Sequence, residues 1–203
     1  MKNIFIFIIL ILLISACSTE YSPEYEVAVK DEIVEMRNNS TTFTAAEISE
    51  MFLPIISFSI DNNPKRDSIL LNNEQLVILL LSMTIHETNY LKSGLVSCEN
   101  VLGIKKLKLR PSISLKTFEY NNNVKTTELA EFACFYSFAD CYHNWITMIT
   151  SNKKYEDFCK AETLPNAIFE LAEIYATDPE YNSHIRGYAI TISELFNLSK
   201  LMK

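Results

Sequence analysis

The stretch NNEQLVILLLSMTIHETNY, residues 72–90, decides how the rest of this chain is interpreted. Asn72 and Gln75 have the spacing of a capping box, so a helix is expected to begin here. Residues 76–85 are apolar on nearly every face, which is typical of a helix buried among other helices. Glu87 follows this run, and a buried carboxylate must pair, cap a helix or take part in chemistry. The stretch therefore predicts a central core helix with an acid at its end.

Capping patterns and apolar runs predict helices on both sides of this core helix. Thr44 and Glu47 form a second capping-box pattern, and Pro54 is expected to end or kink the helix that follows. Ser137 with Asp140 marks the start of another helix. The other predicted helices are residues 164–176 and a last one with Asp178 as its N-cap.

A β-hairpin is predicted between these helices. Residues 112–120 alternate loosely between apolar and polar side chains, residues 121–123 are a run of asparagines, and residues 124–127 are expected to return as a second strand. The predicted fold class is therefore mainly α (α+β), a helical domain with a small inserted β-hairpin lobe.

The N-terminal residues are typical of an export signal. Lys2 precedes an unbroken apolar run at residues 4–14, which is too short for a membrane-spanning helix of about 20 residues. The sequence ISAC at residues 14–17 resembles a bacterial lipobox, in which cleavage precedes the cysteine and the cysteine carries lipid. We expect a signal peptide at residues 1–16 and a membrane anchor through lipid on Cys17. The alternative is an ordinary cleaved signal with an incidental cysteine.

The composition limits the partners of the exported chain. Of 203 residues, 48% are apolar, which excludes a disordered or fibrous protein. Without residues 1–16 the chain has 17 basic and 25 acidic side chains, a net charge of −8. No nucleic acid is expected as a partner, because binding to a phosphate backbone needs a basic surface.

The predicted organisation is a monomer with one folded domain. Residues 17–43 are expected to form a lipidated tether, with a short helical stretch near residues 26–37, and residues 44–203 the domain. Localisation is expected in the cell envelope, facing the periplasm. The outer membrane is favoured because Ser18 provides no obvious inner-membrane retention signal.

Four cysteines follow Cys17. An even number in an oxidising compartment permits two disulfides with three possible connectivities, but free buried thiols fit the sequence equally well. The four residues are Cys98, Cys134, Cys141 and Cys159.

Several kinds of catalytic site are excluded by their motifs. His86 and Glu87 begin an HExxH pattern, but Tyr90 stands where the second zinc ligand would be. Three glycines in the whole chain leave no phosphate-binding loop, and no G-x-S-x-G elbow is present. No metal or cofactor is expected. An acid at the end of an apolar helix, with further acids in a polar hairpin, suits glycoside hydrolysis, although a structural ion pair would also explain Glu87.

Five stretches, in order, resemble one enzyme family. IHETNYLKS (residues 85–93) and NVLGIK (100–105) are similar to the E-S-G-W-G-x-S … N-L-F-G-I-K signature of bacterial endo-β-N-acetylglucosaminidases, glycoside hydrolase family 73. This family includes a flagellar muramidase-like domain and many autolysins. TFEY (117–120), residues 132–145 and YATDPEY (175–181) resemble its later motifs. The resemblance implies a lysozyme-like fold with the β lobe facing a cleft.

The resemblance implies three catalytic residues. Glu87 matches the general acid that protonates the glycosidic oxygen. Glu119 matches a second acid on the mobile β lobe, which activates water or supports the charged intermediate; a solvated strand residue is the alternative. Tyr175 matches the tyrosine that lines the cleft beside the acid, with core packing as its alternative.

Three further residues are expected to bind substrate. Tyr90 stands where the family has Trp and would stack on a sugar face. Asn100 and Tyr120 are expected to contribute to the same cleft, and Asn100 with Gly103 to shape the loop below the acid.

The resemblance implies hydrolysis of the β-1,4 bond after N-acetylglucosamine in the glycan strands of peptidoglycan. Asn89 and Leu91 replace two signature glycines, so the turn after the core helix is expected to be built differently, since Leu disfavours positive φ. Two alternatives stay open: a lytic transglycosylase, and a catalytically inactive lipoprotein that binds peptidoglycan.

Overall fold

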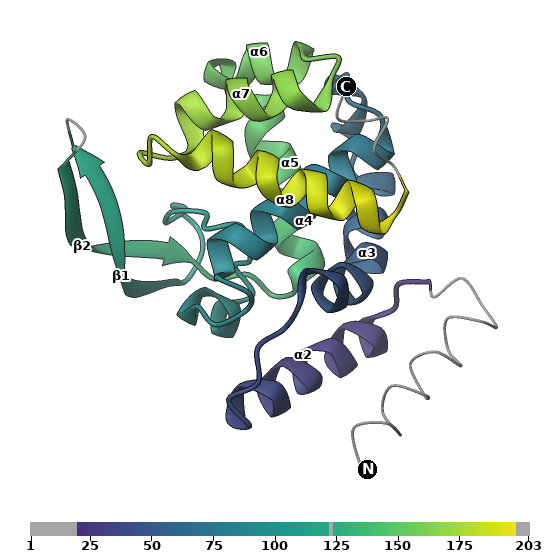
Figure 1. Ribbon diagram of the computed structural model, residues 1–203, viewed down its shortest axis with the longest axis vertical. Helices are drawn as coiled ribbons and strands as arrows, with labels where there is room; N and C mark the ends of the chain where they lie inside the picture. Colours follow the sequence, from purple (N-terminus) through teal and green to yellow (C-terminus); the bar gives the residue numbers. More distant parts are fainter. Residues whose placement is uncertain (1–19, 122–123, 198–203) are drawn as a thin grey trace.

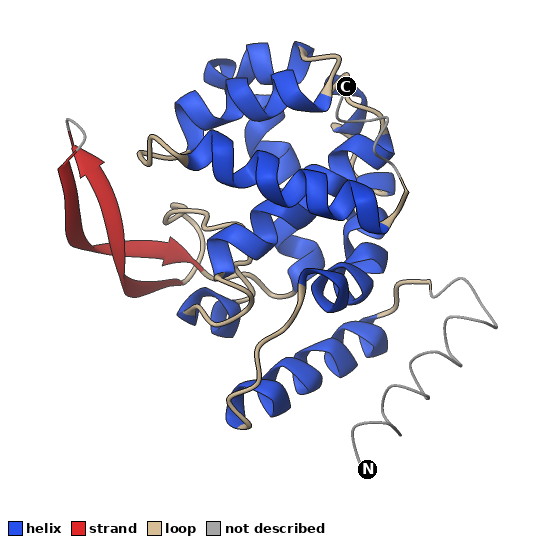
Figure 2. Cartoon of the chain, in the orientation of Figure 1, coloured by secondary structure: helices blue, strands red, loops and turns tan. Residues whose placement is uncertain are grey.

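The computed structural model describes residues 20–121 and 124–197 of the chain. These residues form seven α-helices and one two-stranded sheet, which confirms the mainly α fold with an inserted hairpin (Figures 1 and 2). The signal peptide and Cys17 lie outside the described residues. The helices are α2 (Pro23–Asn38), α3 (Ala45–Asp61), α4 (Asn73–Thr88), α5 (Phe138–Ser151), α6 (Glu156–Lys160), α7 (Leu164–Tyr175) and α8 (Tyr181–Leu195). The short 3-10 helices are η1 (Arg66–Ser68), η2 (Gly94–Cys98) and η3 (Lys153–Tyr155), and the strands are β1 (Ser112–Asn121) and β2 (Val124–Ala133).

Helix α4 is the centre of the core, as its apolar run predicts. The capping box of Asn72 and Gln75 is present in both directions, and residues 76–85 are all buried. α3, α7 and α8 pack against it, and α8 lies across it in Figure 1. This packing fixes the position of the end of α4, where Glu87 lies.

Helix α3 begins at its predicted capping box but does not end at Pro54. The helix continues to Asp61 with Pro54 inside it. Proline in a helix interior costs about 3 kcal/mol. Apolar side chains on both sides of Pro54, including Ile48, Phe52, Ile55 and Ile56, are fully buried, and this burial outweighs the cost.

Helix α2 lies within the segment expected to be a tether, but it packs on the domain. Val29 and Ile33 belong to the hydrophobic core. The buried Glu26 carboxylate accepts the backbone N–H groups of Phe138 and Ala139 at the start of α5. A free tether would leave these apolar and charged groups in water, so residues 23–38 belong to the folded body.

The hairpin is longer than the sequence pattern suggests. β1 and β2 pair antiparallel from Ser112↔Ala133 to Asn121↔Val124, so the second strand continues well past residue 127. The hairpin projects from the helical body (Figure 2). Its base is tied down by a disulfide between Cys98, at the end of η2, and Cys134, directly after β2, with the Cα atoms 4.7 Å apart. Cys141 and Cys159 are free thiols, which resolves the connectivity.

Among the described residues, no helix has both the length and the apolar character needed to cross a membrane.

The turn after α4 contains three consecutive non-glycine residues in the left-handed region. Asn89, Tyr90 and Leu91 have φ of 48°, 56° and 61°. The expectation that Leu91 avoids positive φ is therefore wrong. Its side chain is fully buried, and its N–H donates to Thr88 Oγ1 at 3.0 Å, so packing and hydrogen bonding offset the strain.

The strain in this turn gives a stability prediction. Asn89 is exposed, and asparagine tolerates the left-handed region far better than a β-branched residue does. Asn89→Val is expected to lower the free energy of unfolding by about 1–2 kcal/mol, whereas Asn89→Gly changes it by less than about 0.5 kcal/mol. Urea denaturation of the two variants checks this. Equal stability of both variants would show that this turn does not hold a left-handed residue at position 89.

Candidate active site

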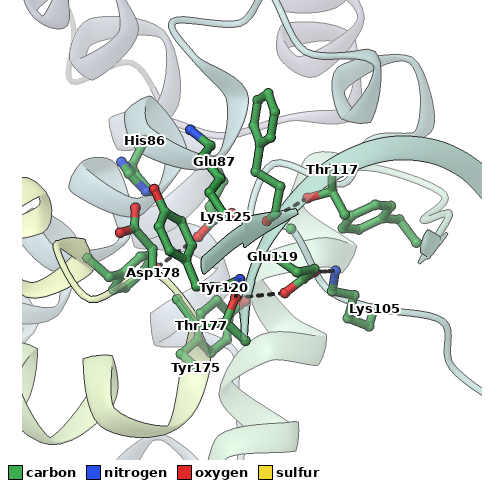
Figure 3. A pocket seen from close by; sticks show the side chains of 15 residues that line it. His86, Glu87, Lys105, Thr117, Glu119, Tyr120, Lys125, Tyr175, Thr177 and Asp178 are labelled. Atoms are coloured by element: carbon green, nitrogen blue, oxygen red, sulfur yellow. Dashed lines mark hydrogen bonds and ion pairs between the residues drawn. The ribbon is translucent and has the colours of Figure 1, made fainter. Parts of the chain in front are cut away.

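A cavity of about 380 Å³ lies between the hairpin and the helical body. Its walls come from four parts of the chain: the end of α4, the loop at residues 103–105, the hairpin, and the connection from α7 to α8. Figure 3 shows side chains from these segments converging on it. The six residues with the closest bearing on its chemistry are Glu87, Gly103, Lys105, Glu119, Tyr175 and Tyr181.

Glu87 lies in the last turn of α4 and lines this cavity. The Tyr181 hydroxyl donates a hydrogen bond of 2.8 Å to Glu87 Oε1. Burial raises the pKa of Glu87 to about 7, and the Tyr181 hydrogen bond and the Lys105 charge offset only part of this effect. Glu87 therefore keeps a proton over much of the neutral range, as a general acid requires.

Gly103 provides the space that the Glu87 carboxylate occupies. A Cβ atom on Gly103 would lie 2.5 Å from Glu87 Oε2, closer than any van der Waals contact allows. Gly103 also has a φ of +66°, which other residues adopt only with strain. Both properties require glycine beside the acid.

Asn100 holds the loop that contains Gly103. Its amide nitrogen donates to the carbonyls of Ile104 and Ala133, each at 2.8 Å, and its Oδ1 accepts the Ile104 N–H at 2.9 Å. Asn100 has no exposed surface. This differs from the expectation that Asn100 binds substrate, because a side chain that is fully buried and hydrogen-bonded to backbone cannot touch a sugar.

Glu119 faces the cavity from β1 and is held by two donors. Lys105 Nζ lies 2.6 Å from its Oε1, and Thr177 Oγ1 donates to its Oε2 at 2.8 Å. Partial burial raises the pKa of Glu119, but the hydrogen bonds from Lys105 and Thr177 outweigh it, and the pKa is lowered. The cavity thus contains one carboxyl with a raised pKa and one with a lowered pKa, a combination that separates acid and base roles.

Thr177 also connects the hairpin to the helical body. Its Oγ1 accepts the backbone N–H of Tyr120 at 3.0 Å while donating to Glu119. This contact joins β1 to the connection between α7 and α8, and it places Tyr120 in the cavity wall. Residues from the two lobes therefore face the same space.

Tyr175 lines the cavity, and its hydroxyl donates to the Leu102 carbonyl at 2.6 Å. Burial, followed by the nearby Glu87 charge, raises its pKa well above the usual value, so it remains a neutral phenol. Its ring lies 6.2 Å from that of Tyr181. Tyr175 therefore supplies a rigid aromatic wall next to the acid.

Tyr90 is not among the residues that line this cavity. Its ring packs edge-on against that of Tyr188 of α8, with the ring centres 6.0 Å apart. The structure therefore separates Tyr90 from the other predicted substrate-binding residue in the cavity, Tyr120.

Three cavity residues were missed as functional residues by the sequence interpretation: Tyr181, Lys105 and Thr177. All three lie inside the stretches NVLGIK and YATDPEY, so the motifs contained the signal. Their roles depend on contacts with Glu87 and Glu119, which the order of residues does not show.

The last helix begins later than its predicted cap. α8 starts at Tyr181, and Asp178 instead accepts the Glu180 N–H in the preceding turn at 2.9 Å. His86, Asp178 and His184 come together here and form the one group in the described part of the chain that could hold a metal ion.

The fold and the cavity define a lysozyme-like glycoside hydrolase. The chain belongs to the glucosaminidase family, whose model, described as mannosyl-glycoprotein endo-β-N-acetylglucosaminidase, matches residues 72–193. No curated protein matches the chain in sequence.

Similar solved structures share this fold. A peptidoglycan hydrolase mutant from Sphingomonas sp. A1 has a TM-score of 0.61 at 17% identity, over 76% of this chain and 99% of that one. The catalytic domain of the autolysin Auto from Listeria monocytogenes has a TM-score of 0.55 at 21% identity, over 89% and 98%. A truncated glycoside hydrolase domain of FlgJ from Salmonella typhimurium has a TM-score of 0.52 at 20% identity, over 72% and 98%.

Proposed function

We propose that this protein hydrolyses peptidoglycan, cutting the β-1,4 bond after N-acetylglucosamine in the glycan strands with Glu87 as the general acid. The observation that carries the proposal is the pair of carboxyls in one cavity, Glu87 with a pKa of about 7 and Glu119 with a lowered pKa. Family membership supports the bond. The similar structures from Sphingomonas and Listeria, named as a peptidoglycan hydrolase and an autolysin, support the polymer.

In the proposed reaction, Glu87 donates its proton to the glycosidic oxygen as the bond to C1 breaks. The negative charge of Glu119 stabilises the oxocarbenium-like sugar that forms. Water then adds to C1, and its proton passes to a carboxylate in the cavity. Tyr175 and Tyr120 form walls against which the sugar can be positioned.

Fragment analysis tests the proposal. The full chain, purified in detergent, is incubated with peptidoglycan sacculi, and the released fragments are identified by mass spectrometry. Fragments with reducing N-acetylglucosamine ends are expected, and they should be much reduced by Glu119→Gln. Fragments with anhydro-muramic ends, released by the Glu119→Gln variant at the same rate as by the parent, would assign the protein to the lytic transglycosylases. Binding of sacculi without any release would identify an inactive binding protein.

The pH dependence of activity follows from Glu87. Because the general acid must be protonated, kcat/KM is expected to fall as the pH rises through about 7. The Tyr181 hydroxyl lowers the pKa of Glu87, so Tyr181→Phe should move this fall to higher pH. The measurement is kcat/KM on a soluble glycan fragment between about pH 5 and 9. Tyr136→Phe, an exposed tyrosine outside the cavity, is the matched control and should leave the profile in place.

A coinciding profile for the parent and Tyr181→Phe would contradict this assignment. The hydrogen bond to Tyr181 would then have no influence on the group that titrates, and an acid other than Glu87 would set the profile.

We also propose that the chain is exported as a monomer and anchored in the envelope through lipid on Cys17, facing the periplasm from the outer membrane. The Cys98–Cys134 disulfide supports an oxidising compartment. Mass spectrometry of the membrane-extracted protein tests the anchor. Acyl chains on an N-terminal Cys17, lost together with membrane association in Cys17→Ser, are expected. A mature chain without acyl mass would show an ordinary cleaved signal.

A further inference from the structure

A group of potential metal ligands lies at one side of the cavity, on residues that the proposed hydrolysis does not use. His86 comes from the end of α4, Asp178 from the connection between α7 and α8, and His184 from α8. One ligand atom from each lies within 4.8 Å of the other two. Figure 3 shows His86 and Asp178 on the same side of the cavity, away from Lys105 and Glu119.

The lone pairs that a metal needs are available in this group. Asp178 Oδ1 is engaged by the Glu180 N–H, while Oδ2 lies 3.8 Å from His184 Nδ1. The rings of His86 and His184 face each other at 5.3 Å with a tilt of 32°. Within residues 20–121 and 124–197, neither imidazole forms a hydrogen bond to a protein group. Two imidazoles and one carboxylate therefore lie close together without forming hydrogen bonds to one another.

The environment of His184 also resembles that of a metal-bound histidine. With Nδ1 toward Asp178, its Nε2 lies 3.7 Å from Glu180 Oε2. Metal-binding histidines commonly donate their second ring N–H to a carboxylate, which fixes the tautomer and orients the ring. Glu180 is placed to take this role.

We propose that His86, Asp178 and His184 form a binding site for a divalent transition metal, with Zn²⁺ as the best-suited ion. Two imidazoles and a carboxylate suit zinc, at ligand distances of about 2.0–2.2 Å. Ligand atoms at these distances from a tetrahedral ion lie about 3.3–3.6 Å apart, so atoms that now lie within 4.8 Å of one another must approach by at most about 1.5 Å. Three protein ligands leave a fourth position for water. A bound ion would tie the connection before α8 to the end of α4.

The sequence could not indicate this site. His86 begins an incomplete HExxH pattern, and the second imidazole comes from a helix far along the chain instead of the next turn. The proposal is independent of the proposed function, because its test reads metal binding and not hydrolysis.

The test is titration of the full chain, purified in detergent and stripped with a chelator, with Zn²⁺ by calorimetry at pH 7.5 and with Co²⁺ by absorption spectroscopy. One equivalent of Zn²⁺ should bind and raise Tm. His184→Ala should weaken binding by about 100-fold or more, and Glu180→Gln by about tenfold. His143→Ala is the matched control, because His143 on α5 is the one histidine of the chain outside the proposed site. This variant should bind Zn²⁺ like the parent.

Three outcomes would overturn the proposal. The parent could fail to bind one equivalent of Zn²⁺, or His184→Ala could bind as tightly as the parent although it is folded by circular dichroism. A thiolate charge-transfer band in the Co²⁺ spectrum would assign the ion to a cysteine such as Cys159, which is a free thiol.

Discussion

Glu87→Gln is expected to reduce the release of glycan fragments from sacculi by about 10³-fold without unfolding the protein. Glutamine has the shape of the protonated acid and can accept the Tyr181 hydrogen bond, but its amide N–H is far too weak an acid to protonate the glycosidic oxygen. The measurement is the initial rate of fragment release, with circular dichroism to confirm the fold. Glu173→Gln on α7 is the matched control, since Glu173 is exposed and outside the cavity. More than a tenth of the parent's activity in Glu87→Gln would show that Glu87 is not the acid.

The same variant is also expected to change how the free energy of unfolding depends on pH. The pKa of Glu87 in the folded chain is raised from 4.5 to about 7, so the folded state binds this proton more tightly than the unfolded state. The stabilisation is complete below pH 4.5 and is lost as the pH rises to about 7, and it is on the order of 3 kcal/mol. Glu87→Gln should lack this loss and be more stable than the parent above pH 7. Denaturation at about pH 4 and about pH 8, on the two sides of this window, checks it.

Gly103→Ala is the second substitution with a large expected effect. Its methyl group would lie 2.5 Å from Glu87 Oε2, and alanine at a φ of +66° is strained. The carboxyl must move or the loop must rebuild. Activity should fall by about 100-fold, because small misplacement of a catalytic group has effects of this size. The free energy of unfolding should fall by about 1–3 kcal/mol.

Gly187→Ala is the control for the glycine substitution. Gly187 lies in α8, and a methyl group at this position would meet no heavy atom within 4 Å, so there is no clash. Alanine is the better helix former, and stability should rise by about 0.5–1 kcal/mol with unchanged activity. If Gly103→Ala were as active as Gly187→Ala, the loop would not position the acid.

Much of the fold could be predicted from local patterns. Capping boxes at Thr44 and Asn72 set the starts of α3 and α4, and the apolar run after Asn72 indicated the core helix. These signals are local, because a cap satisfies N–H groups within one turn and burial follows the period of the helix. The order of the motifs also brought Glu87, Glu119 and Tyr175 into one proposed cleft, and the structure places all three around the same cavity.

Other features depended on packing between distant segments. Pro54 stays inside α3 and Leu91 adopts positive φ because burial in the core outweighs their local preferences. Asn100 is a brace for the loop and Tyr90 packs on α8, although their place in the motifs suggested contact with substrate. Local preferences amount to a few kcal/mol at most, which tertiary packing can override.

The sequence by itself determined the mainly α fold, the position of the acid at the end of its core helix, and the family resemblance. Only the tertiary structure decided what surrounds the two carboxyls of the cavity. Glu87 accepts the hydroxyl of Tyr181, 94 positions away in the chain, and occupies the space that Gly103 leaves open. Glu119 is held by Lys105 and Thr177. The tertiary structure also decided the Cys98–Cys134 pairing and the meeting of His86 with His184. Helix caps and periodicity act between neighbours in the chain, whereas pKa values, disulfides and metal ligands depend on distances in space.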